Sequence, residues 1–235
     1  MRKSATALIG ATLMLGALVV PAVSAQEVPL CGPPGGQVPA TIVGSGLIVG
    51  TQGNDVIVGS SGADQILGLG GDDVICAEGG NDLVIGGAGN DTLIGDSIDL
   101  PPFLPSDGTN DDHLIGGPGN DTLAGLGGDD TLDGGDGDDQ LIGMGGVDTI
   151  RGGPGDDTAF GGPFDDDIAG GPGNDILWGT FGSDLISGGP GDDMIDGDNP
   201  FPTPPGLPPF IIGTNDDTCV GGPGADTVTN CETSS

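Results

Sequence analysis

The sequence predicts an all-β fold, a parallel β-solenoid of about nine turns with 18 residues and two nonapeptides in each turn. Three observations predict it: a nine-residue repeat over most of the chain, glycines at fixed places in the repeat, and one apolar residue per repeat. The repeats run without a break through 41–94, 107–196 and 212–229, which gives 18 units. Periodicity of this kind indicates stacked coils in which each turn contacts only its neighbours.

The glycines and the apolar residue divide each repeat into a turn and a strand. Position 1 is Gly in 14 units and position 4 is Gly in 15. Because glycine adopts positive φ at little cost, we expect the first six positions to form a turn. The last three positions, such as 122–124, are expected to form a short strand with only its middle side chain turned inward. That middle position is apolar in all 18 units, from Ile48 to Val228.

The charge of the chain is strongly one-sided. It contains 36 acidic residues and three basic ones, of which only Arg151 lies beyond the first three residues. Such a surface repels phosphate groups and anionic lipid, so we expect no nucleic-acid partner. The self-repulsion also opposes a compact state, which makes cations the expected partners.

Aspartate occupies position 6 in 17 of the 18 units, and Gly46 is the exception. In an 18-residue coil these carboxylates lie above one another, with turn carbonyls around them. Ca²⁺ takes 6 to 8 oxygen ligands in flexible geometry and suits such a cage better than Mg²⁺. Eight gaps on each edge of the coil allow at most about 16 ions. The predicted metal ligands are Asp55, Asp64, Asp73, Asp82, Asp91, Asp112, Asp121, Asp130, Asp139, Asp148, Asp157, Asp166, Asp175, Asp184, Asp193, Asp217 and Asp226.

Units such as GGPGNDTLA (116–124), GGDGDDQLI (134–142) and GGPGNDILW (170–178) give the repeat a family resemblance. They resemble the GGxGxDxUx nonapeptide of the RTX, or haemolysin-type, calcium-binding repeat family. The resemblance implies a parallel β-roll with Ca²⁺ held between consecutive turns by the position-6 aspartates and turn carbonyls. With a cleavable leader and no effector domain, the chain looks most like the short, exported, stand-alone repeat proteins of actinobacteria.

Three units depart from the pattern at position 4, where Asn110, Phe164 and Asn215 replace glycine. We expect the calcium sites at Asp112, Asp166 and Asp217 to be less secure for this reason.

The ends of the chain predict export. Arg2 and Lys3 precede an uncharged stretch and then a small-residue pattern, so 1–25 is interpreted as a signal peptide. The uncharged stretch is shorter than the ~20 residues that a spanning helix needs, so no membrane span is expected. We divide the rest into an N-terminal cap (26–40), a β-roll (41–229) and a tail (230–235), and expect a secreted, extracellular protein.

Four cysteines in an exported chain predict two disulfides. Cys31 and Cys76 belong to one end of the coil, and Cys219 and Cys231 to the other. The two ends are too far apart for cross-linking, so we predict Cys31–Cys76 and Cys219–Cys231. Each would close a cap on one end of the coil.

Two proline-rich insertions, 95–106 and 197–211, interrupt the repeat, and the longer segments 95–112 and 197–217 share the frame GD…GTNDD. Both precede odd-numbered units, so both are expected to leave the same edge of the coil. They either fold back over the coil or, with Phe103, Phe201 and Phe210, form a docking surface.

The sequence therefore supports three hypotheses about function. The first is a secreted, non-enzymatic protein in which Ca²⁺ between stacked turns drives folding. The second is an adhesin or cell-envelope protein that binds a cell surface or glycan through the insertions. The third, an enzyme, is disfavoured because His113 and Arg151 are the only basic or imidazole side chains after the leader.

Phe160 and Trp178 occupy position 9 one turn apart, on an outward-facing row. They are expected to stack as a ladder that serves the coil, and the alternative is a platform for a sugar or a partner.

Overall fold

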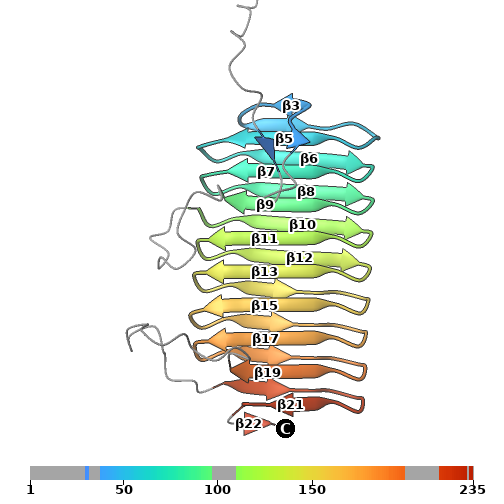
Figure 1. The fold of residues 1–235 in the computed structure, drawn as a ribbon, viewed down its shortest axis with the longest axis vertical. Helices are drawn as coiled ribbons and strands as arrows, with labels where there is room; N and C mark the ends of the chain where they lie inside the picture. Colours follow the sequence, from blue (N-terminus) through green and yellow to red (C-terminus); the bar gives the residue numbers. More distant parts are fainter. Residues whose placement is uncertain (1–29, 32–37, 97–109, 199–216, 232, 235) are drawn as a thin grey trace, which may run out of the picture.

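The computed structural model describes residues 30–31, 38–96, 110–198, 217–231 and 233–234. They form a rod of stacked parallel strands, with turns at its two long edges (Figure 1). Two sheets of ten strands each make the two faces of the rod. The predicted β-solenoid is confirmed, and it makes about eight turns where about nine were expected. The described part of the chain contains no helix with the length and hydropathy needed to cross a membrane.

One face, here called the odd sheet, contains the odd-numbered strands from β3 onward. They are β3 (Ile42–Val43), β5 (Val56–Ser60), β7 (Val74–Glu78), β9 (Thr92–Asp96), β11 (Thr122–Gly127), β13 (Gln140–Gly145), β15 (Thr158–Pro163), β17 (Ile176–Phe181), β19 (Met194–Asp198) and β21 (Thr227–Thr229).

The opposite face, the even sheet, contains the even-numbered strands from β4 onward. They are β4 (Leu47–Val49), β6 (Gln65–Gly70), β8 (Leu83–Ala88), β10 (His113–Pro118), β12 (Thr131–Asp136), β14 (Thr149–Arg151), β16 (Asp167–Ala169), β18 (Leu185–Ser187), β20 (Thr218–Val220) and β22 (Thr233–Ser234). A separate antiparallel pair, β1 (Leu30–Cys31) and β2 (Val38–Pro39), lies at the N-terminal end.

The register of the strands follows the repeat. Leu123 pairs with Leu141, 18 residues later, and both belong to position 8. The separation grows only across the two insertions, where Leu83 pairs with His113 and Leu185 with Thr218. The first insertion follows β9 and the second follows β19, both strands of the odd sheet. Both insertions therefore attach to the same edge of the rod, as expected, although most of their residues lie outside the described ranges.

Two details of the predicted strands are wrong. Many strands are longer than three residues and continue into the predicted turn, because positions 1 to 3 of successive turns also hydrogen-bond to each other. Gly135, for example, donates its N–H to the carbonyl oxygen of Gly152 at 3.1 Å. The second correction concerns β3, which lies in the first unit where a turn was expected. Its β-branched Ile42 and Val43 pair with β5 and add a strand to the end of the odd sheet.

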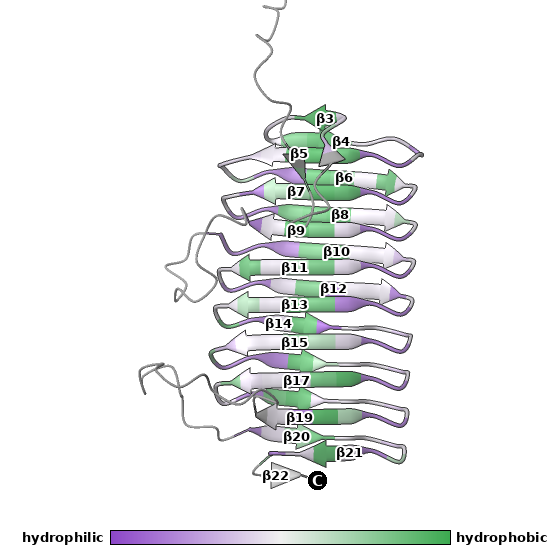
Figure 2. Ribbon diagram, viewed as in Figure 1, coloured by the Kyte–Doolittle hydropathy of each residue, from purple (hydrophilic) through white to green (hydrophobic). Residues whose placement is uncertain are grey.

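The core is the single row of position-8 side chains from both sheets. From Ile48 to Cys219 all of these side chains are buried, and Ile42 and Val228 pack against the two ends of the row. Figure 2 shows apolar residues within the strands and hydrophilic residues at the edges. The predicted one-residue-per-repeat core is therefore confirmed.

Truncating one member of this row should be costly. We expect Leu141→Ala to lower the free energy of unfolding in calcium-containing buffer by about 2–5 kcal/mol, because Leu141 is fully buried and the stacked turns cannot close the cavity. Leu185→Ala is the matched control, because Leu185 lies at an outward position of β18 and is half exposed. It should change stability by less than about 0.5 kcal/mol. Denaturant unfolding of both variants measures the difference, and equal losses would contradict this description of the core.

A second apolar cluster lies outside the odd sheet at its N-terminal end. It consists of Cys31, Val58, Cys76 and Ile94, with Ala40, Val56, Val74 and Leu126 packed against it. The disulfide between Cys31 and Cys76 joins β1 to β7 within this cluster. A second disulfide joins Cys219 to Cys231 at the other end of the rod. Both predicted pairings are confirmed, and each ties a terminal segment to the solenoid.

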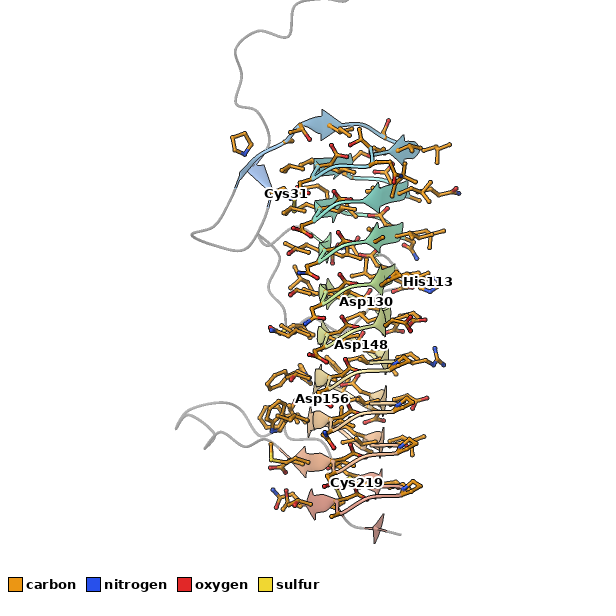
Figure 3. The ribbon with its side chains drawn as sticks, turned by 90° about the vertical axis from the view of Figure 1, so that its right-hand side faces the viewer. Cys31, His113, Asp130, Asp148, Asp156 and Cys219 are labelled. Atoms are coloured by element: carbon orange, nitrogen blue, oxygen red, sulfur yellow. A yellow bond between two sulfur atoms is a disulfide. The ribbon has the colours of Figure 1, made fainter. Side chains whose placement is uncertain are left out.

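The outward row at position 9 contains the expected aromatic ladder. The Phe160 and Trp178 rings stack with centroids 4.3 Å apart and planes 15° apart. His113 lies at the outward position 7 of β10, where it is exposed (Figure 3).

Candidate calcium sites

The loops form two edges of the rod, here called the odd edge and the even edge after the sheet whose strands precede them. Each predicted aspartate ends one loop, directly before the next strand. Because the turns repeat in register, the aspartates are stacked in two columns. The odd edge contains Asp64, Asp82, Asp112, Asp130, Asp148, Asp166, Asp184 and Asp217, and the even edge contains Asp55, Asp73, Asp91, Asp121, Asp139, Asp157, Asp175, Asp193 and Asp226.

In every column member except Asp55, one carboxylate oxygen accepts a hydrogen bond from the backbone of the previous turn. Asp112 donates its N–H to Oδ1 of Asp130 at 2.8 Å, and Asp130 donates its own N–H to Oδ1 of Asp148 at 2.9 Å. Figure 3 labels Asp130 and Asp148. The same bond recurs along both edges. The position-6 side chain thus satisfies a buried N–H that no strand pairing reaches.

The other oxygen, Oδ2, is buried and has no hydrogen-bond partner among the described residues in most of the column. A buried carboxylate oxygen without a partner is costly, and its usual partner would be a donor or a cation. The residues with this arrangement include Asp73, Asp82, Asp91, Asp112, Asp121, Asp130, Asp139, Asp148, Asp157, Asp166, Asp175 and Asp193.

Position 1 of many loops brings a backbone oxygen to the same place. A Cβ added to Gly116 would overlap Oδ2 of Asp121 and would lie 2.5 Å from the carbonyl oxygen of Gly134, one turn later. The carboxylate and the next turn's carbonyl therefore face one point. No three His, Cys, Asp or Glu side chains converge on a common point within the described ranges. Any cation here would be held by carboxylates together with backbone carbonyls, an oxygen-only set that Ca²⁺ prefers.

Burial raises the pKa of these carboxyl groups, and nearby carboxylates raise it further. The pKa is about 9 for Asp112 and Asp166 and about 8 for Asp130. It is about 7 for Asp121, Asp148 and Asp157, and about 6 for Asp82, Asp91 and Asp175. The hydrogen bond from the previous turn lowers the pKa in each case but does not cancel the effect of burial. Without a cation, this arrangement favours protonated carboxyls.

Two of the three irregular units take the same geometry as most of the others. Asn110 and Phe164 adopt positive φ, 64° and 111°, as most glycines at position 4 do. Asp112 and Asp166 accept the same Oδ1 hydrogen bonds as the rest of their column. The loops at these two aspartates are therefore regular, and less secure calcium sites at Asp112, Asp166 and Asp217 stay a prediction. Asn215 lies outside the described residues.

Three predicted ligands differ from the others. Asp226, in the last loop, is only partly buried. Asp55 and Asp64, in the first complete loop of each edge, have hydrogen-bond partners for Oδ2.

A second side-chain ladder was missed at position 5. Asp129 accepts a hydrogen bond from the N–H of Val147, one turn later, at 2.9 Å. On the even edge the ladder is nearly continuous, and its acceptors are Asn54, Asp72, Asn90, Asn120, Asp138, Asp156, Asn174 and Asp192. The signal was present in the sequence, because position 5 is Asn or Asp in most units.

Asp96 was also missed. It follows Gly95 at position 2 of an interrupted loop on the odd edge, and its side chain is 1% exposed. Burial raises the pKa of Asp96 to about 7, and the charges of Asp82 and Glu78 act in the same direction. The only sequence signal is the Gly-Asp pair with which both insertions begin.

Comparison with known proteins agrees with this geometry. The family model described as RTX calcium-binding nonapeptide repeat (4 copies) matches residues 49–84, 77–97, 106–141, 133–168, 169–199 and 213–228. These matches cover more than half of the chain. A search of curated proteins found no match.

Proposed function

Because the chain belongs to the family of RTX calcium-binding nonapeptide repeats, we propose that it is an exported calcium-binding protein whose rod folds when Ca²⁺ occupies the gaps between its turns. The position-6 aspartates are the proposed ligands, together with the turn carbonyls. The protein acts as a structural module and not as an enzyme.

The observation that carries this proposal is the repeated, buried Oδ2 without a partner. A single such atom would be a local defect. Here the same defect recurs in successive turns, beside a carbonyl oxygen of the next turn. A divalent cation in each gap would neutralise the carboxylates and replace the water that they lose on burial.

The donor atoms select the type of ion. Carboxylate and carbonyl oxygens suit Ca²⁺, whereas zinc and copper sites use His and Cys. Mg²⁺ demands a stricter octahedron and keeps its waters, which suits a tight gap between two backbones poorly. The maximum of about 16 ions stays a prediction.

Calcium would matter for folding because the core is so thin. Each repeat contributes one side chain to it, and the cost of ordering the other eight residues is large. An ion between two turns binds only when both are formed, so its binding free energy adds to the stability of the rod.

Two features support export. The first is the pair of disulfides, Cys31–Cys76 and Cys219–Cys231, which suit an oxidising compartment. The second is the signal-peptide pattern in the sequence of 1–25, a segment that lies outside the described residues. Extracellular calcium is near-millimolar, and extracellular modules bind it at ~10⁻⁴–10⁻³ M.

Calcium titration of the metal-free chain tests the proposal. Far-ultraviolet circular dichroism should change from a largely unfolded spectrum to a strand spectrum over a narrow range of calcium. The fluorescence of Trp178, the single tryptophan, should change at the same calcium concentration, because its stacking on Phe160 requires the folded turns. Mg²⁺ at equal concentration is the control and should have a much smaller effect. A full strand spectrum that survives excess chelator at pH 8 would overturn the proposal.

The alternative, an adhesin or cell-envelope protein, depends on the insertions 95–106 and 197–211. Phe103, Phe201 and Phe210 lie outside the described residues, so a cell-surface or glycan partner stays a prediction.

A further inference from the structure

The first complete loop on each edge satisfies its aspartate without a cation. Oδ2 of Asp55 accepts hydrogen bonds from the N–H of Thr51 at 2.6 Å and from its hydroxyl at 2.8 Å. Oδ2 of Asp64 accepts the same pair from Ser60, at 2.7 and 3.0 Å. These donors occupy position 2 of the loop and take the place that we propose for calcium elsewhere.

The backbone of these two loops also differs. Thr51 and Ser60 keep negative φ, whereas position 2 has positive φ in every later described loop that has no insertion. Leu126 and Met144, for example, have φ of 83° and 81° despite their side chains. Positive φ is costly for such residues, so a strong local preference must hold the later loops in this form.

A hydroxyl at position 2 does not produce the difference alone. Thr180 occupies the same position in a later loop, where it has φ of 88° and donates its hydroxyl to the carbonyl oxygen of Gly162 at 2.6 Å. The Thr180 loop follows a complete loop on its edge, the one that ends in Asp166. The Thr51 loop has no loop before it on its edge, and the Ser60 loop has only the short turn at Gly46 before it. The first two loops therefore differ from the later ones in two respects taken together: they lie at the end of the rod, and they have a hydroxyl side chain at position 2.

The same end of the rod has other stabilising contacts that need no metal. The second apolar cluster covers the outside of the odd sheet here, and the Cys31–Cys76 disulfide joins β1 to β7.

We propose that Thr51 and Ser60 replace the metal ion in the first two loops, so that Asp55 and Asp64 are not calcium ligands and the N-terminal end of the rod is stable without calcium. Calcium binding then begins at the loops that end in Asp73 and Asp82, and the preformed end serves as the template on which later turns stack. This inference rests on the proposed calcium-dependent function, and it identifies the N-terminal end as the part of the rod that folds without calcium.

Calcium stoichiometry of the full-length protein gives the first test. Equilibrium dialysis should give the same number of bound ions for Asp55→Asn, Asp64→Asn and the unaltered protein, whereas Asp130→Asn should bind fewer. If the first two variants lose as many ions as Asp130→Asn, this inference is wrong and the proposed function stands. If the unaltered protein binds no calcium, the proposed function itself fails.

Hydrogen exchange in chelator gives a second test that does not depend on the aspartate variants folding. Amides of β4 and β6 in the unaltered protein should exchange more slowly than those of β11 to β17. The double variant Thr51→Ala, Ser60→Ala should remove this protection by a factor of about ten or more, because two hydrogen bonds to buried carboxylates are lost. Thr180→Ala is the matched control and should not change β4 or β6. Uniformly fast exchange along the unaltered, metal-free rod would overturn the inference.

Discussion

In metal-free buffer, strand content should rise as the pH is lowered from about 9 to about 5, because the folded rod holds protons that the unfolded chain has lost. The pKa of Asp112 is about 9 in the fold, against 3.8 for an ordinary aspartate. Below pH 3.8 both states are protonated and this group does not oppose folding. As the pH rises towards 9 the unfolded chain releases the proton first, so stability is lost progressively over that range.

The expected effect is large because many groups act together. Each unit of difference between folded and unfolded pKa corresponds to about 1.4 kcal/mol. Asp112, Asp130 and Asp166 all have pKa values of about 8 or 9, and burial also raises the pKa of most other aspartates in the two columns. The sum approaches or exceeds the roughly 5–15 kcal/mol by which domains are usually stable. The metal-free rod should therefore be unfolded at pH 8, apart from the N-terminal end discussed above.

Circular dichroism in chelator, recorded against pH at two salt concentrations, measures this effect. Repulsion between exposed acids acts in the same direction, but it is screened by salt and ends near pH 4. A transition centred above about pH 6 and insensitive to salt would identify the buried columns. A transition centred near pH 4 that disappears in salt would contradict the assignment.

Asp130→Asn should reverse its effect on stability between the two metal states. With saturating calcium we expect the free energy of unfolding to fall by about 3–5 kcal/mol. The amide can still accept the hydrogen bond from the N–H of Asp112, but it lacks the negative charge that pairs with the proposed Ca²⁺. In chelator the same change should stabilise the rod, because it removes a carboxylate whose pKa burial raises to about 8. Unfolding free energies measured with calcium, and in chelator at about pH 5 where the metal-free rod is folded, give the two signs.

Asp129→Asn is the matched control. Asp129 is the neighbouring residue, but it is exposed, and its Oδ1 accepts a hydrogen bond from Val147 that an amide can also accept. We expect changes of less than about 0.5 kcal/mol in both buffers. Equal effects of the two substitutions would show that Asp130 acts through overall charge and not as a ligand.

The sequence was sufficient to predict most of the rod. The 18-residue register, the buried row from Ile48 to Cys219 and both disulfides follow from the repeat, because each residue's place in a solenoid depends only on its position in its own turn. The alignment of the aspartates in two columns followed for the same reason.

The repeat did not predict three features: the rotation of the aspartate side chains, the backbone conformation of the first two loops, and the extra strand at the end of a sheet. The Oδ1 hydrogen bond and the partnerless Oδ2 depend on how the carboxylate is rotated, which the pattern does not specify. Asp55 and Asp64 match the pattern as well as Asp130 does, yet their loops at the end of the rod take another conformation. β3 forms because the end of a sheet has a free edge, a feature that an internal period cannot contain.

The two side-chain ladders give the rod a direction. At position 6 a carboxylate reaches back to the turn before it, and at position 5 a side-chain oxygen reaches on to the turn after it. Two adjacent residues thus hydrogen-bond to the two different neighbouring turns. A turn that has both hydrogen bonds is linked to the turn before it and to the turn after it. Substituting a position-6 residue removes a hydrogen bond to the preceding turn, whereas substituting a position-5 residue removes one to the following turn. The turn that separates first when the rod unfolds locally therefore depends on which of the two adjacent residues is substituted.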